Sequence, residues 1–218
     1  GGDGDLGFVD GGYLPAVKQL CETYDALYIA DEVQTGLMRT GELWGITKYG
    51  VEPDILVTGK GISGGIYPIA CVVVGKDHAG WLTEDGFGHM ATMGGAELGC
   101  IVALKVLEIV QRDEVRSSVR FIADYMSKQL TAIRQRYDDF FVGIRQNGLV
   151  MGLEFNHPKG AMVVMKALYE NGVWAIFSTL DPRVLQFKPG LLMTPDLCEE
   201  LVNRMEVAIG QARTEVFG

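Results

Sequence analysis

The chain has 218 residues, with 19 Lys and Arg residues against 28 Asp and Glu residues and a formal net charge of -9. This length can bury a substantial hydrophobic core, and the negative charge argues against nucleic acid as the main partner. No apolar run reaches the roughly 18 residues that a membrane helix needs. The 29 glycines exceed the number that a typical share of ~7% would give, and this excess indicates tight loops where backbone approaches a ligand.

Cysteine and histidine patterns argue against disulfides and metal sites. The cysteines are far apart, and none forms a C-x-x-C pair, which predicts reduced core residues at Cys21, Cys71, Cys100 and Cys198. The three histidines lack metal-ligand spacing, so we expect no metal. Residues 1–5 show no signal-peptide pattern, and we expect a cytoplasmic protein with no membrane association.

The first part of the chain alternates predicted helices with short apolar strands. Apolar spacing predicts a helix over residues 13–24, a strand over 26–30, a helix over 42–49 and strands over 55–58 and 70–74. This alternation favours a mostly parallel sheet covered on both faces. The third strand follows the second closely, so we expect it to run antiparallel or to cross the sheet by a loop.

Two long helices follow a glycine-rich stretch at residues 85–99. Each carries a stripe of apolar residues, and the stripe of the second helix recurs at steps of three and four, as in a helix with one buried face. The first stripe comprises Ile101, Leu104, Val106, Leu107 and Val110, and the second comprises Val115, Val119, Ile122, Met126, Leu130 and Ile133.

The pattern changes near Tyr137, where we place a domain boundary. The remaining residues predict a small α+β domain over 138–218, whereas residues 1–137 belong to a larger domain that includes the long linking helices. Its expected elements are strands over 140–144 and 149–155 joined at an Asn-Gly turn, helices over 161–170 and 197–213, and short strands near 173–175 and 184–187.

Two carboxylates, Asp31 and Glu32, directly follow the first predicted strand. Ligands of open α/β sheets bind at the carboxyl ends of strands, although a helix cap or a solvated loop acid would show the same pattern. A magnesium-dependent nucleotidase would also place acids here. That interpretation needs a G-x-x-x-x-G-K-[ST] phosphate loop, and the chain contains none.

Lys60 leaves the second predicted strand between two glycines. Such a lysine is often an ordinary loop residue, but in a crowded, partly dry position its amine becomes a nucleophile. An acid and a lysine at the ends of neighbouring strands, surrounded by glycines, could hold a cofactor with a basic nitrogen at one end and an aldehyde at the other. Pyridoxal 5'-phosphate has this chemistry.

These motifs resemble those of the class III (ω-type) aminotransferases of pyridoxal-phosphate fold type I. The resemblance rests on residues 29–36 (IADEVQTG), 39–41 (RTG), 49–54 (YGVEPD), 59–61 (GKG) and 89–95 (HMATMGG). It implies an α/β fold, with part of a large-domain sheet followed by the small α+β domain. It also implies transfer of an amino group from an amine or amino acid to a 2-oxo acid.

The resemblance implies a role for each matching residue. Lys60 bonds the cofactor covalently and moves a proton, Asp31 pairs with the ring nitrogen, Val33 packs on the ring and Gln34 lies near the ring hydroxyl. Thr92 reaches the cofactor phosphate of a neighbouring subunit, which implies a homodimer with shared active sites.

The chain departs from the family pattern in three places. The family has an arginine for the substrate carboxylate shortly before a Pro-Pro pair, whereas residues 184–191 read VLQFKPGL. Gln186 takes the arginine's place, so either Lys188 or another group binds the carboxylate, or the amino donor has no α-carboxylate. Residues Ala96-Glu97 replace a family Asn-Pro, and family members are roughly twice as long, with a phosphate-binding loop in their other half. A lyase acting on a phosphorylated or activated amine, and an inactive fragment, therefore stay as alternatives.

Overall fold

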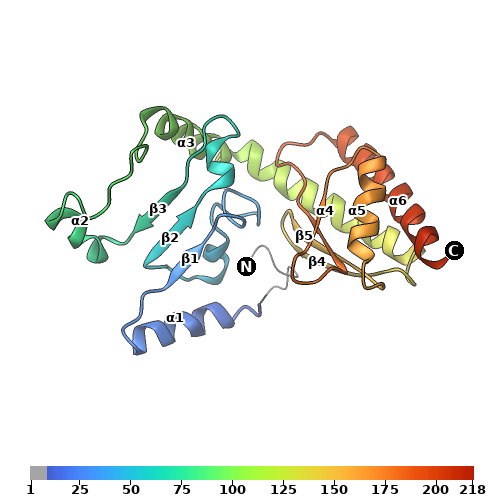
Figure 1. The fold of residues 1–218 in the computed structure, drawn as a ribbon, viewed down its shortest axis with the longest axis horizontal. Helices are drawn as coiled ribbons and strands as arrows, with labels where there is room; N and C mark the ends of the chain where they lie inside the picture. Colours follow the sequence, from blue (N-terminus) through green and yellow to red (C-terminus); the bar gives the residue numbers. More distant parts are fainter. Residues whose placement is uncertain (1–8) are drawn as a thin grey trace. The chain divides into compact units, whose positions relative to one another are not determined.

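The computed structural model describes residues 9–218; residues 1–8, which include the segment without a signal-peptide pattern, lie outside the described residues. The described chain divides into two compact units, residues 9–112 and residues 113–218. Each unit has its own sheet (Figure 1). No helix of the described residues has both the length and the apolar character needed to cross a membrane.

The first unit contains a three-stranded sheet in the order β1-β2-β3 (Figure 1). Strands β1 and β2 run parallel, and β3 is antiparallel to β2, which confirms one of the two predicted courses for β3. The elements are α1 (Tyr13–Thr23), β1 (Ile29–Asp31), the 3-10 helix η1 (Gly45–Tyr49), β2 (Ile55–Thr58), the 3-10 helix η2 (Lys60–Ser63), β3 (Cys71–Val74), the 3-10 helix η3 (Lys76–His78), α2 (Gly80–Glu84) and α3 (Glu97–Val110).

A small core packs beneath β1. Tyr28 and Ala30 point to this side together with Ile46 and Val51, and α1 adds Leu14, Val17 and Cys21 at its helical spacing. The side chain of Asp54 fastens α1 to the sheet. It accepts hydrogen bonds from the Tyr28 backbone N–H at 2.7 Å and from Lys18 Nζ at 3.0 Å. These bonds, with the Tyr28 N–H contributing most, hold the pKa of Asp54 below its usual value.

Three expectations for this unit were wrong. The sheet is not covered on both faces by the described residues, because the neighbouring β3 residues Val72 and Val73 are 63% and 57% exposed. The predicted helix over 42–49 begins only at Gly45 and is a 3-10 helix. The apolar stripe of α3 is partly open, since Ile101 and Leu104 are exposed rather than packed.

The second unit has an antiparallel sheet in the order β4-β5-β7-β6. Helices pack on one face of this sheet: α4 contacts β4, and α5 contacts the other three strands (Figure 1). All six apolar residues predicted for the α4 stripe are buried. The elements are α4 (Asp113–Arg136), β4 (Phe141–Asn147), β5 (Val150–Phe155), α5 (Gly160–Glu170), β6 (Ile176–Phe177), β7 (Val184–Phe187) and α6 (Pro195–Phe217).

The short strand predicted near residues 173–175 was misplaced, because the residues that pair with β7 are Ile176 and Phe177. The division between the two units falls between Arg112 and Asp113 in the sequence, so that α4 belongs with the second sheet. The domain boundary near Tyr137 stays a prediction. Cys198 is buried, and the other three cysteines are partly buried.

Candidate active site

Asp31 and Lys60 lie at the same edge of the first sheet. Because β1 and β2 are parallel and Asp31 pairs in register with Val57, the carboxyl ends of both strands lie together at one edge of the sheet. Asp31 is the last residue of β1, and Lys60 follows the end of β2 by two residues. The structure therefore brings the predicted acid and the predicted lysine to one edge.

The backbone of Lys60 is in the left-handed region, with φ of 49°. A residue with a Cβ adopts this conformation at a cost of about 1–2 kcal/mol, and such strain concentrates at functional sites. The side chain is exposed and lines a pocket of about 430 Å³ together with Ser63 and residues 65–69. The lysine thus combines an unfavourable backbone conformation with a place in the lining of a pocket.

Val33 lies next to the segment that carries Lys60. A Cβ placed on Gly59 would stand 3.7 Å from both Val33 methyl groups and 3.5 Å from the Ala70 Cβ. Val33 and Gln34 are both partly buried. Val33 also follows Asp31 by two residues, and its backbone N–H donates to Asp31 Oδ1 at 3.0 Å. An acid, an aliphatic side chain and an amine therefore share this edge.

The sequence analysis noted Glu32 as one of two acids after the first strand, but the family resemblance gave a role only to Asp31. The Glu32 side chain is only 4% exposed, and its carboxylate accepts hydrogen bonds from Thr35 Oγ1, from Gly45 N at 3.0 Å and from Ile46 N at 2.7 Å. Strand alternation could have predicted this burial, because Glu32 is two residues from Ala30 and four from Tyr28 and therefore points to the same face of the sheet.

Thr92 is not linked by hydrogen bonds, among the described residues, to the acid and the lysine at the sheet edge. It is exposed, in the segment between α2 and α3. Its assignment to a neighbouring subunit's cofactor stays a prediction.

Gln186 and Lys188 belong to the second unit. Gln186 is buried in β7, and its Oε1 accepts a hydrogen bond from Lys188 Nζ at 2.7 Å. It pairs in register with Gly152 of β5, which in turn pairs with Arg145 of β4, so the three residues form one row across the sheet. The opposite face holds the fully buried Met151 and Leu153 beneath the helices. The row therefore lies on the face away from that core.

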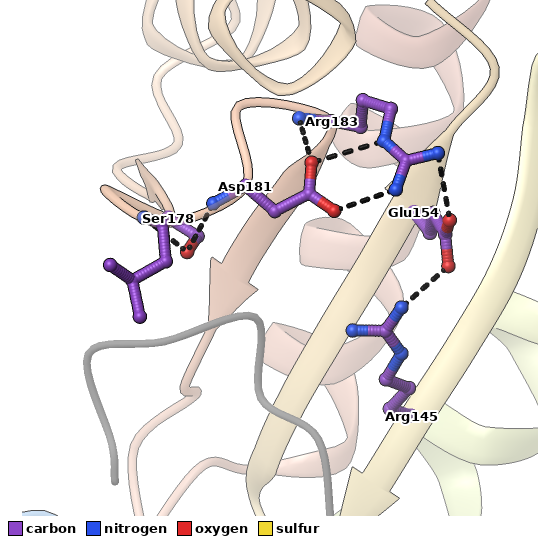
Figure 2. Close-up of polar contacts among 6 residues, drawn as sticks. Arg145, Glu154, Ser178, Asp181 and Arg183 are labelled. Carbon is purple, nitrogen blue, oxygen red and sulfur yellow. Dashed lines mark hydrogen bonds and ion pairs between the residues drawn. The ribbon is translucent and has the colours of Figure 1, made fainter.

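An ion-pair network crosses the same face (Figure 2). Glu154 Oε2 accepts a hydrogen bond from Arg145 Nη2 at 2.8 Å, and Glu154 Oε1 lies 3.6 Å from Arg183 Nη1. Arg183 Nη2 donates to Asp181 Oδ2 at 2.8 Å, and Ser178 Oγ accepts from the Asp181 backbone N–H. The Arg183 hydrogen bond lowers the pKa of Asp181. The network joins β4, β5 and the segment that enters β7, and so fixes the strand that carries Gln186.

The chain is thus an α/β protein in which an acid and a lysine lie at the ends of two adjacent parallel strands. The family Aminotransferase class-III matches residues 1–209, and the chain belongs to that family. It is 39% identical over 196 residues to an uncharacterized aminotransferase of Archaeoglobus fulgidus, covering 88% of this chain and 46% of that protein. It is 32% identical over 212 residues to the acetylornithine aminotransferase of Caldanaerobacter subterraneus subsp. tengcongensis, covering 97% of this chain and 52% of that protein.

A solved structure agrees with these relatives. The ornithine aminotransferase of Toxoplasma gondii, crystallized with partial occupancy of PLP at its active site, superposes with a TM-score of 0.83 at 28% identity. The match covers 94% of this chain and 48% of that one. The fold is thus the expected part of a fold type I aminotransferase, and the chain spans about half the length of the curated relatives it matches.

The residues at the sheet edge fit pyridoxal phosphate, the cofactor of this family. The cofactor has a ring nitrogen that binds a proton, flat ring faces and an aldehyde. The edge offers a carboxylate at Asp31, an aliphatic surface at Val33 and a primary amine at Lys60. The carboxylate suits the ring nitrogen, the aliphatic side chain suits a ring face, and the amine suits the aldehyde.

Proposed function

We propose that this chain carries the lysine and the ring-binding acid of a pyridoxal-phosphate-dependent aminotransferase. The reaction is transfer of an amino group from an amine or amino acid to a 2-oxo acid. The observation that carries the proposal is the strained, left-handed Lys60 at the same sheet edge as Asp31. Membership of the aminotransferase family supports it.

Each proposed residue acts through its own chemistry. The cofactor, when bound, supplies an electron-accepting ring. Asp31 holds the proton on the ring nitrogen, because a negative carboxylate beside a basic nitrogen favours the protonated, positively charged form of that nitrogen. Lys60 would hold the cofactor through its amine, and the same amine, when free, would carry a proton to and from the substrate carbon.

The remaining cofactor contacts orient the ring and hold its phosphate. Val33 packs against a ring face, and Gln34 lies near the ring hydroxyl. Thr92 reaches the phosphate at a neighbouring subunit's site, which makes the functional unit a homodimer with shared active sites. We assign residues 1–137 to the cofactor-binding domain, with α4 as a linking helix that packs in the second unit, and residues 138–218 to the small domain. We propose the cytoplasm as the location.

Lys188 is the proposed contact for the substrate carboxylate. Its ammonium group is held by Gln186 Oε1, so the pair presents one positive charge where a neutral amide alone would present none. A single ammonium cannot reproduce the paired hydrogen bonds that a guanidinium makes to a carboxylate. We therefore expect this protein to prefer α-amino acids over simple amines less strongly than an enzyme with an arginine at this position.

The neutral Gln186 also favours a second candidate, a lyase that acts on a phosphorylated or activated amine. A half-reaction separates the two. The chain is loaded with cofactor and mixed with an amino donor in the absence of a 2-oxo acid. Stoichiometric conversion of the cofactor to its amine form supports transfer, whereas release of ammonia without that conversion contradicts transfer and supports the lyase.

A further inference from the structure

The acid that ends β1, Asp31, and the acid that follows it, Glu32, point to opposite sides of the sheet. Along β1 and its two flanking residues, every second residue is buried: Tyr28, Ala30 and Glu32 are 8%, 7% and 4% exposed. The residues between them, Ile29 at 59% and Asp31, are exposed. Successive side chains of a strand face opposite ways. Asp31 therefore faces the open side, and Glu32 lies beneath the sheet.

The Glu32 carboxylate closes the loop that follows Asp31. One oxygen accepts from Thr35 Oγ1 and Gly45 N, and the other accepts from Ile46 N. A Cβ on Gly45 would stand 3.3 Å from Glu32 Oε2, closer than most side-chain contacts allow. A buried carboxylate is costly without such donors, and here three donors surround it.

The backbone of Glu32 is held as firmly as its side chain. Its N–H donates to the Val57 carbonyl oxygen at 2.8 Å, and its own carbonyl oxygen accepts from Gly36 N at 3.0 Å. The next residue, Val33, donates its N–H to Asp31 Oδ1. The group that orients the Asp31 carboxylate thus belongs to a turn whose position Glu32 fixes.

We propose that Glu32 is a positioning residue: from beneath the sheet it fixes the turn at residues 32–36 and thereby orients the Asp31 carboxylate toward the ring nitrogen of the cofactor. This inference rests on the proposed function, because it gives Asp31 its role at the cofactor.

Glutamine at position 32 tests the proposal with little change of shape. The site presents three donors, and a carboxylate has two acceptor oxygens. A glutamine amide has one oxygen, and its NH2 group would face either the Ile46 N–H or the Gly45 N–H. One backbone donor would then meet another donor and stay buried without an acceptor.

The experiment compares the wild-type chain with Glu32→Gln, Asp31→Asn and the control Glu52→Gln, an exposed acid in the same unit. Cofactor affinity is measured by absorbance titration, together with the pH at which the absorbance of the bound cofactor changes. Amide hydrogen exchange of residues 31–46 is measured on the chain without cofactor. We expect Glu32→Gln to weaken affinity at least about tenfold, to speed exchange at Gly45 and Ile46, and to shift the spectral pH midpoint in the direction that Asp31→Asn shifts it.

Each other outcome contradicts a definite part of the account. Affinity within about twofold of wild type overturns the positioning role and leaves the proposed function standing. Weaker affinity with an unchanged pH midpoint shows that Glu32 merely stabilises the loop, and it also overturns the proposal. A wild-type chain that binds no cofactor contradicts the proposed function itself. Amide exchange at Gly45 and Ile46 that is equally fast in Glu52→Gln would show that the change does not depend on Glu32, and it would overturn the positioning role.

Discussion

Replacing Gly36 by alanine should destabilise the loop that follows Asp31. A Cβ at this position would lie 2.7 Å from the Trp44 ring and 2.8 Å from the backbone carbonyl oxygen of Glu32. Real Cβ contacts are longer, and a backbone oxygen held by its own hydrogen bond cannot move aside cheaply. The Gly36 N–H itself donates to that oxygen at 3.0 Å, so the clash opposes an existing bond.

The expected cost follows from overpacking in a closed site. Forcing extra volume into a packed region costs about 1–3 kcal/mol of the free energy of unfolding. Alanine also restricts the unfolded chain, which offsets about 0.4–1 kcal/mol of that loss. We therefore expect a net destabilisation of about 1–2 kcal/mol.

Urea unfolding followed by tryptophan fluorescence measures this loss, since Trp44 is the side chain against which the new methyl group would pack. The control is Gly86→Ala, because a Cβ there would meet nothing within 4 Å. We expect that control to stay within about 0.5 kcal/mol of wild type. Equal stability of Gly36→Ala and wild type would refute the packing that we describe between Trp44 and the turn.

Three further predictions concern stability. Truncation of the fully buried Leu130 to alanine should cost about 2–5 kcal/mol in urea unfolding, whereas Lys128→Ala on the exposed side of the same helix should cost under about 0.5 kcal/mol; similar losses would contradict the α4 stripe. Because the folded pKa of Asp54 is lowered, its contribution is present above the unfolded pKa near 3.8 and is lost as pH falls through the folded value. Asp54→Asn should therefore flatten the fall of Tm below about pH 4, and an unchanged slope would refute the role of its hydrogen bonds. A double-mutant cycle on Arg145 and Glu154 should give a coupling of about 1 kcal/mol or less that shrinks in high salt, and a coupling insensitive to salt would contradict a partly exposed ion pair.

Regular periodicity made the second unit the more predictable part of the fold. The α4 stripe could be read directly, because six apolar residues at helical spacing needed only one buried face. The same reasoning placed β2 correctly but misplaced β6, where an apolar triplet precedes the two residues that pair with β7. Pairing depends on a partner strand, and a short apolar run does not reveal which of its residues that partner reaches.

Apolar sequence also could not show which faces the described residues cover. Ile101 and Leu104 of α3 follow helical spacing yet are exposed, as are Val72 and Val73 of β3. Periodicity reports that a face is apolar and leaves open what packs on it. The site showed the same division: motifs indicated Asp31 and Lys60, but the role of Glu32 depends on hydrogen bonds to Gly45 and Ile46, far along the loop.

The central claim is that Lys60 of this chain bonds the cofactor, and covalent labelling tests it most directly. The chain is incubated with pyridoxal phosphate, reduced with borohydride and mapped by peptide mass spectrometry, with Lys60→Ala as the matched control. We expect one equivalent of reduced cofactor on the peptide that contains Lys60 and none on that peptide in the variant. An unlabelled Lys60, or label spread evenly over exposed lysines such as Lys128 and Lys159, would contradict the account.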